Sequence, residues 1–251
     1  MSSLAISFIT FACVFGGALL GISLRAALPE HHLSADSKDV VKLGMGLVAT
    51  MAALVLGLLI ASAKASYDTQ STEVTEMSAK VILLDRVLAH YGPETKEARA
   101  LLYGIVARAL DRMWPKDRTD SSQAAPQTSG AEVLYDKVQE LSPKDDMQRS
   151  LQAQALTMMM RLGETRWLMY EQGVTSVSTP LLVVLVMWLT FLFVSFGVLA
   201  PPNATVVASL FVSALSVSGA ILLILEMYSP YAGLIQVSSA PLRAALAHLG
   251  Q

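Results

Sequence analysis

Apolar residues in this chain gather into four long runs, arranged as two pairs on either side of a charged middle. The runs cover residues 4–24, 43–63, 181–199 and 204–225, and none of them contains Asp, Glu, Lys or Arg. Each run has about 20 residues, which as an α-helix spans the roughly 30 Å of a bilayer's hydrocarbon core. A soluble helix of this length would show a polar face. The pattern therefore predicts four transmembrane helices.

The charges lie mainly between the two pairs of runs. Residues 64–178 hold 14 of the 18 Lys and Arg residues and 16 of the 20 Asp and Glu residues. This segment is predicted to be a solvated helical bundle extending from the second and third spans, with a mobile loop over 116–130. We expect an all-α integral membrane protein in four parts: a first span pair 1–63, a helical extension 64–178, a second span pair 179–225 and an interfacial tail 226–251.

Helical periodicity continues past the second span. Apolar residues recur three and four positions apart, at Val74, Met77, Val81, Leu84 and Leu88. We predict a single rod of about 45 residues in all, with Lys80, Asp85 and Arg86 off this seam. Farther along, Ser142-Pro143 has the character of a helix N-cap and first turn, with Asp145 at the capping-box position. Ser239 is the predicted cap of a last, amphipathic helix.

Small residues four positions apart mark the first two spans. The first span has Gly17 and Gly21, and the second has a longer stripe at Ala49, Ala53, Gly57 and Ala61. Small residues at this spacing let helix backbones approach closely in lipid. Each stripe is expected to pack against a helix. A sharper hypothesis is that one of them faces a neighbouring subunit or a narrow pore.

Composition and motifs argue against several classes of function. Apolar residues make up 53% of the chain and charged residues 15%, and no basic stripe is present, so nucleic acid is not an expected partner. The single cysteine, Cys13, is interpreted as a packing residue and excludes a disulfide within the chain. Motifs of zinc proteases, serine hydrolases and phosphate-binding loops are missing from the sequence. We expect no enzyme activity, no cofactor and no bound metal, and we interpret His31-His32 as solvated loop residues.

Ionisable residues at span ends are candidates for structural or selective roles. Lys64 ends the second span, and Glu226 ends the fourth on the same predicted side of the membrane. They either reach separately to the interface or pair and tie the two span pairs together. Lys42 lies at the opposite end of the second span. In a conducting protein it would draw anions toward a pore entrance.

The most specific stretch of the chain is its tail, residues 226–246. Glu226, Pro230, Tyr231 and Gly233 form an acid-x-x-x-Pro-aromatic-x-Gly run, followed by Pro241-Leu242. Upstream, the accompanying positions are Tyr67, Glu94, Ala98-Arg99, Tyr103 and Trp114-Pro115. Together these residues, spread over nearly the whole length, resemble the bacterial bestrophin-like family of four-span membrane proteins. Family members more often have Asp and Phe where this chain has Glu226 and Tyr231, and both replacements keep the chemistry.

The resemblance implies a distant similarity to bestrophins, which are pentameric, calcium-regulated chloride channels with paired spans around a cytosolic helical middle. It favours a homo-oligomeric channel or transporter for anions, with the second span nearest the axis. Bestrophins place aromatic residues in a pore neck on that span, whereas residues 43–63 include no Phe, Tyr or Trp. The sequence also has no dense acidic cluster like a calcium clasp. The alternative function is a non-conducting membrane scaffold whose cytosolic helices bind a protein partner.

Orientation follows from the even number of spans. The N-terminus, the middle segment and the tail share one side of the membrane, and Lys and Arg residues near span ends are slightly more numerous on that side. The positive-inside rule places this side in the cytoplasm. We therefore expect a multi-pass protein of the bacterial inner membrane, in contact with the lipid bilayer and with both termini cytoplasmic.

Overall fold

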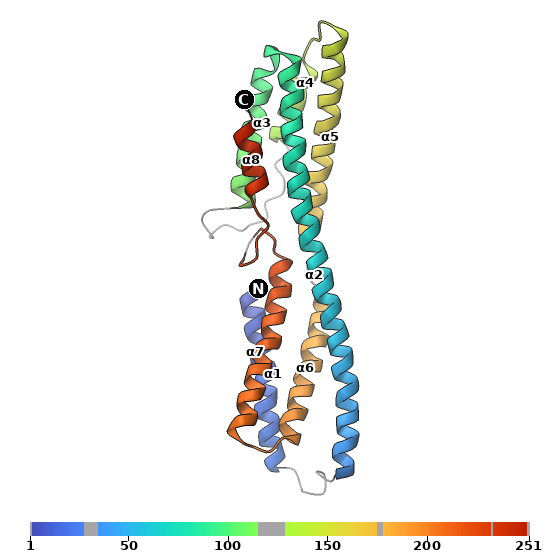
Figure 1. Ribbon diagram of the computed structural model, residues 1–251, viewed down its shortest axis with the longest axis vertical. Helices are drawn as coiled ribbons and strands as arrows, with labels where there is room; N and C mark the ends of the chain where they lie inside the picture. The colour runs from blue at the N-terminus through green and yellow to red at the C-terminus, as the bar shows by residue number, and fades with distance from the viewer. Residues whose placement is uncertain (1, 28–34, 115–128, 175–177, 232, 250–251) are drawn as a thin grey trace. The chain divides into compact units, whose positions relative to one another are not determined.

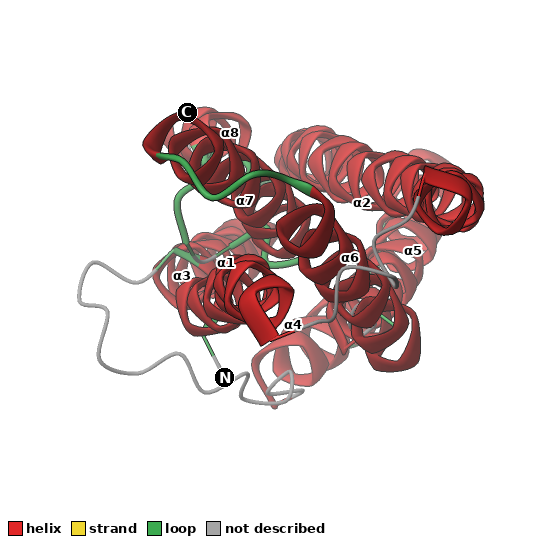
Figure 2. Cartoon of the chain, turned by 90° about the horizontal axis from the view of Figure 1, so that it is seen from below, coloured by secondary structure: helices red, strands yellow, loops and turns green. Residues whose placement is uncertain are grey.

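The computed structural model describes all of the chain except residues 1, 28–34, 115–128, 175–177, 232 and 250–251. Every regular element in the described part is a helix, as Figure 1 and Figure 2 show. The elements in chain order are α1 (Ser3–Ala27), α2 (Ala35–Tyr91), the short 3-10 helix η2 (Pro93–Thr95), α3 (Lys96–Met113), α4 (Ser129–Gln139), α5 (Asp146–Val174), α6 (Thr179–Leu199), α7 (Ala204–Met227) and α8 (Ala240–His248). The prediction of an all-α protein is confirmed.

Four of these helices, α1, α2, α6 and α7, are long and apolar enough to cross a membrane. They contain the four apolar runs recognised in the sequence, and three of them end within three residues of the predicted limits. The exception is α2, which begins at Ala35 and continues without a break for 57 residues. The predicted rod was therefore too short, because the polar stretch before residue 43 is also helical.

Contacts divide the chain into two compact units. Unit 1 comprises Met1–Ser66 and Ser176–Tyr228, and unit 2 comprises Tyr67–Thr175 and Ser229–Gln251. Helix α2 contributes its first part to unit 1 and its remainder to unit 2. Each unit has a hydrophobic core of its own.

In unit 1, α1 packs along both α6 and α7 (Figure 1). Aromatic rings add to the α1–α7 contact: Phe211 meets Phe11 and Phe15 edge-on, at ring-centre distances of 5.5 and 5.3 Å.

Side chains in unit 1 also form hydrogen bonds with the backbone groups at helix ends. The guanidinium of Arg25 donates to the last carbonyls of α6, including that of Leu199 at 2.9 Å, and the Asn203 side chain accepts from the backbone N–H of Val206 at the start of α7. These contacts satisfy backbone groups that a helix end leaves open.

In unit 2, the later part of α2 packs with α3, α4, α5 and α8. The predicted seam on α2 faces this core: Val74, Val81, Leu84 and Leu88 are all at most 4% exposed. The seam is thus buried within the protomer, and α8 contributes Leu242 to the same core. The end of α4 is held by Gln152 of α5, whose side-chain amide donates to the carbonyls of Val138 and Leu141.

Two predicted helix caps were wrong. Helix α5 is capped by Asp145, whose carboxylate accepts from the backbone N–H of Gln148 at 2.7 Å, and Ser142-Pro143 lies before the helix. A carboxylate is the better acceptor at this helix start because it also interacts with the helix dipole. Ser239 occupies the N-cap position of α8 without capping it, since its hydroxyl accepts from Arg243.

Helix α4 begins at Ser129, two residues before the predicted start, so that the end of the predicted loop 116–130 is helical. The remainder of that loop, to residue 128, and the pair His31-His32 lie outside the described residues.

Candidate functional site

The small-residue stripe of the second span lies on an open face of α2. Ala53, Gly57 and Ala61 are exposed, and Ala49 is half-buried. Apart from the helix's own backbone, no described atom lies within 4 Å of the position that a Cβ on Gly57 would take. Helix α2 instead uses another face to join the core of unit 1, with Ala52, Leu59 and Ala63. Within the described protomer, the stripe is left without a helix to pack against.

The glycines of the first span, in contrast, pack closely against another helix. A Cβ on Gly17 would lie 3.1 Å from the Thr190 side chain on α6, and a Cβ on Gly21 would overlap the carbonyl of Val194. On the facing helix, a Cβ on Gly197 would overlap the carbonyl of Ala18. Close backbone approach of this kind is what small residues permit between helices in lipid. Of the two predicted stripes, one therefore builds the protomer and the other stays exposed.

Lys42 lies near the start of α2, where its amino group is 3.0 Å from the carboxylate of Asp39. Both side chains are more than 60% exposed. Exposed ion pairs of this type contribute little to stability. The predicted role of Lys42 at a pore entrance remains a prediction.

Glu226 and Lys64 both belong to unit 1. Glu226 is only 5% exposed at the end of α7, whereas Lys64 is exposed. Close by, the hydroxyls of Ser62 on α2 and Tyr228 after α7 are 3.0 Å apart. A hydrogen bond therefore joins the second and fourth spans in this region, and the pairing of Lys64 with Glu226 stays a prediction.

The tail motif forms a closed loop in unit 2. The backbone N–H of Val237 donates to the carbonyl of Pro230 at 2.8 Å, and Gly233 turns the chain with a φ of 99°. This region of backbone space is costly for any residue except glycine. Gly233 is thus needed by the loop's geometry, which gives this position of the motif a structural reason.

The tail loop is held by residues far away in the sequence. Trp114 Nε1 donates to the carbonyl of Val237 at 2.9 Å, and the Trp114 ring meets Tyr231 edge-on at 5.5 Å. The hydroxyl of Tyr67 on α2 donates to the carbonyl of Gln236. Tyr67 and Tyr231 are more than 160 positions apart in the sequence, yet both belong to one small hydrophobic cluster.

Tyr231 has an unusual environment in this cluster. Burial raises the pKa of its phenol well above the ordinary value, and the charge of Glu73 raises it further. The hydroxyl oxygen is buried and has no hydrogen-bond partner among the described residues. At physiological pH the phenol is accordingly neutral, and it acts as a packing group.

Sequence reasoning missed a buried ion pair in unit 2. Asp85 is 3% exposed and accepts from Arg99 Nε at 2.7 Å and from Nη2 at 2.9 Å. Asp85 was predicted off the α2 seam, and that prediction was wrong. The signal was present, because Asp85 follows Val81 by four positions and precedes Leu88 by three, the spacing of a shared helical face.

Comparison with known families decides the identity. A model of the bestrophin-like domain matches residues 12–242, which is most of the chain. The chain belongs to the bestrophin-like domain family. The resemblance seen in the tail and upstream residues is thus confirmed. No curated protein and no solved structure is detectably similar to this bestrophin-like chain. With its four membrane-length helices, it is a membrane protein of that family.

Proposed function

We propose that this bestrophin-like protein is an oligomeric, four-span channel or transporter for anions, with α2 nearest the oligomer axis. One observation carries this proposal: the stripe of Ala49, Ala53, Gly57 and Ala61 is open in the protomer, although its spacing suits close helix packing. A symmetric ring of subunits would cover it with a neighbour's helix or leave it along a narrow pore. The family name points the same way, since bestrophins are pentameric chloride channels.

The proposed topology places unit 2 in the cytoplasm and both chain termini on that side, in the inner membrane of a bacterium. The excess of Lys and Arg near span ends on that side supports this orientation. Lys42 then lies on the opposite, outer side, where its positive charge would raise the local concentration of anions. We expect no enzyme activity, because the sequence has none of the nucleophile, metal-ligand or phosphate-loop motifs.

A second candidate function is a non-conducting scaffold whose cytosolic helices bind a protein partner. The observation that favours it is the composition of the second span. Residues 43–63 have no charged and no aromatic side chain, so the span offers an ion no polar group stronger than a hydroxyl. Unit 2, which contains much of the chain's length, would then bind the protein partner.

Oligomer count and flux separate the two functions. We expect the purified protein in mild detergent to form a closed ring of several subunits, measured by native mass spectrometry, and to release chloride from liposomes. Gly57→Ile adds a branched side chain to the stripe, so it should dissociate the ring and abolish flux. Gly16→Ile is the matched control, since Gly16 on α1 is also exposed with no described atom near a Cβ.

The selectivity test uses Lys42. Reversal of its charge in Lys42→Glu should lower the preference for anions over cations, measured as a shift in reversal potential in planar bilayers. A monomer in detergent with no liposome flux would overturn the channel and leave the scaffold. A ring without flux would also favour the scaffold.

A further inference from the structure

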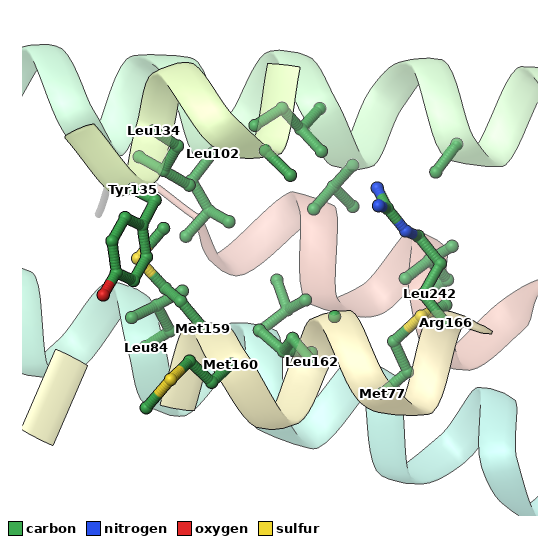
Figure 3. Close-up of a pocket in the computed structure, with 16 residues that line it drawn as sticks. Met77, Leu84, Leu102, Leu134, Tyr135, Met159, Met160, Leu162, Arg166 and Leu242 are labelled. Atoms are coloured by element: carbon green, nitrogen blue, oxygen red, sulfur yellow. The ribbon is translucent and has the colours of Figure 1, made fainter. Parts of the chain in front are cut away.

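Unit 2 contains a cavity among its helices, with a volume of about 170 Å³. Side chains from α2, α3, α4, α5 and α8 line it (Figure 3). Most are apolar, and they include Leu84, Leu102, Leu134 and Met159. An engineered apolar cavity of about 150 Å³ is large enough to bind benzene. This cavity therefore has room for a ligand with a short hydrocarbon tail.

One cation lies in this apolar lining. Among the described residues that line the cavity, Arg166 of α5 is the only Lys, Arg, Asp or Glu. In Figure 3 its side chain rises from α5 toward the opposite helix, at the other end of the cavity from Tyr135. The cavity is thus amphipathic, with a charged end and a long apolar body.

Arg166 is half-buried and incompletely hydrogen-bonded. Its Nε is buried without a hydrogen-bond partner among the described residues. Burial lowers the pKa of the guanidinium, the positive charge of Arg112 lowers it further, and only Glu132 opposes this. An arginine stays protonated in proteins regardless, so Arg166 places a half-buried positive charge with one unpaired, buried nitrogen at this cavity. Such a group costs stability unless it is paired and hydrogen-bonded.

We propose that this cavity binds a small amphiphilic monoanion, an alkyl carboxylate with a tail of about six to eight carbons, whose carboxylate pairs with Arg166. The planar guanidinium fork matches a carboxylate with two hydrogen bonds. The apolar body of the cavity takes the tail and removes it from water. The site is independent of whether the protein conducts ions.

The test is calorimetric titration of sodium octanoate into the full-length protein in lipid nanodiscs, with empty nanodiscs as the blank. We expect saturable binding to the wild type beyond the blank, and binding of octanol weaker by at least about tenfold, because octanol lacks the charge. Arg166→Gln should weaken octanoate binding by about tenfold or more and leave octanol binding unchanged. Arg166→Lys keeps the charge without the fork and should give an intermediate loss.

Two further variants keep the result specific. Arg161→Gln removes an exposed arginine from the same helix and should not alter binding. Gly163→Leu adds a side chain at a lining position with no described atom within 4 Å of a Cβ, and should block octanoate and octanol alike. Binding to the wild type no greater than to empty nanodiscs would overturn the proposal. So would octanoate affinities of Arg166→Gln or a folded Arg166→Lys that equal the wild type's.

Discussion

The carboxylate of Asp85 on α2 accepts two hydrogen bonds from the guanidinium of Arg99 on α3. Nε donates to one carboxylate oxygen at 2.7 Å and Nη2 donates to the other at 2.9 Å. The Asp85 side chain is 4% exposed and that of Arg99 is 20% exposed. The hydrogen bonds that Arg99 donates to Asp85 raise the pKa of Arg99 above its ordinary value. This pair links α2 to α3 in unit 2.

The first prediction concerns this pair. Asp85→Asn keeps the shape of the side chain but leaves Arg99 without its countercharge. Loss of a hydrogen-bonded charge pair should reduce the free energy of unfolding by about 1–3 kcal/mol, measured by denaturant titration in detergent. Lys137→Gln is the control, because the Lys137–Glu97 pair in the same unit is largely exposed, and it should cost under about 0.5 kcal/mol. Equal losses in the two variants would contradict the role given to Asp85.

Much of the helical framework could be predicted from the sequence, since a run of apolar residues of bilayer length leaves few alternatives to a helix. The seam on α2 was also predictable, because five apolar residues at helical spacing define one face. Asp85 was misplaced although it lies on that face, because an isolated acid is expected in solvent. Its partner Arg99 is on another helix, and sequence spacing does not show which helices meet.

The two small-residue stripes show the same limit at the candidate site. Gly17–Gly21 and Ala49–Ala61 have the same spacing, so both permit close packing. The contacts of Gly17 and Gly21 with α6, Gly197 included, show that the first stripe is used inside the protomer. Which helix, if any, packs against each stripe depends on how the helices are arranged in space and does not follow from spacing along the sequence. The tail motif is a further example, since its contact with Trp114 spans 123 positions.

The second prediction tests the α1–α6 contact. Gly21→Val should destabilise unit 1 by about 2 kcal/mol or more, because the added side chain meets the backbone of α6, which cannot move aside as a flexible side chain would. Gly16→Val on the exposed side of the same helix should leave stability within about 0.5 kcal/mol of the wild type. The measurement is the melting temperature in detergent. A wild-type melting temperature for Gly21→Val would mean that α1 and α6 do not approach closely here.

The third prediction concerns the turn at Gly233. Gly233→Ala places a Cβ at a φ of 99° and should cost about 1–2 kcal/mol of unit 2 stability. Gly163→Ala, within helix α5, should do the reverse and stabilise by about 0.5–1 kcal/mol, because alanine favours the helical state. Opposite shifts in melting temperature are therefore expected from the same substitution. Shifts of the same sign would contradict the backbone geometry assigned to the tail.

The fourth prediction tests how the tail is held. Trp114→Phe preserves a ring to face Tyr231 but removes the hydrogen bond to the Val237 carbonyl. The expected loss is about 1 kcal/mol, concentrated in the tail, so trypsin should cut after Arg243 several times faster than in the wild type. Tyr67→Phe removes the hydrogen bond to Gln236 and should act in the same direction. Cleavage at the wild-type rate in both variants would show that these bonds do not retain the tail.

The last prediction concerns Glu226, the buried acid at the end of the fourth span. Glu226→Ala should lower the melting temperature more than a typical surface substitution, because its removal leaves the groups around a buried carboxylate unsatisfied. Lys64→Gln then distinguishes two roles of the lysine. A similar loss indicates that Lys64 pairs with Glu226 and ties the span pairs together, and the charge swap Lys64→Glu with Glu226→Lys should restore part of it. An unchanged melting temperature for Lys64→Gln indicates that Lys64 only anchors the helix at the interface. An unchanged melting temperature for Glu226→Ala would remove the structural role altogether.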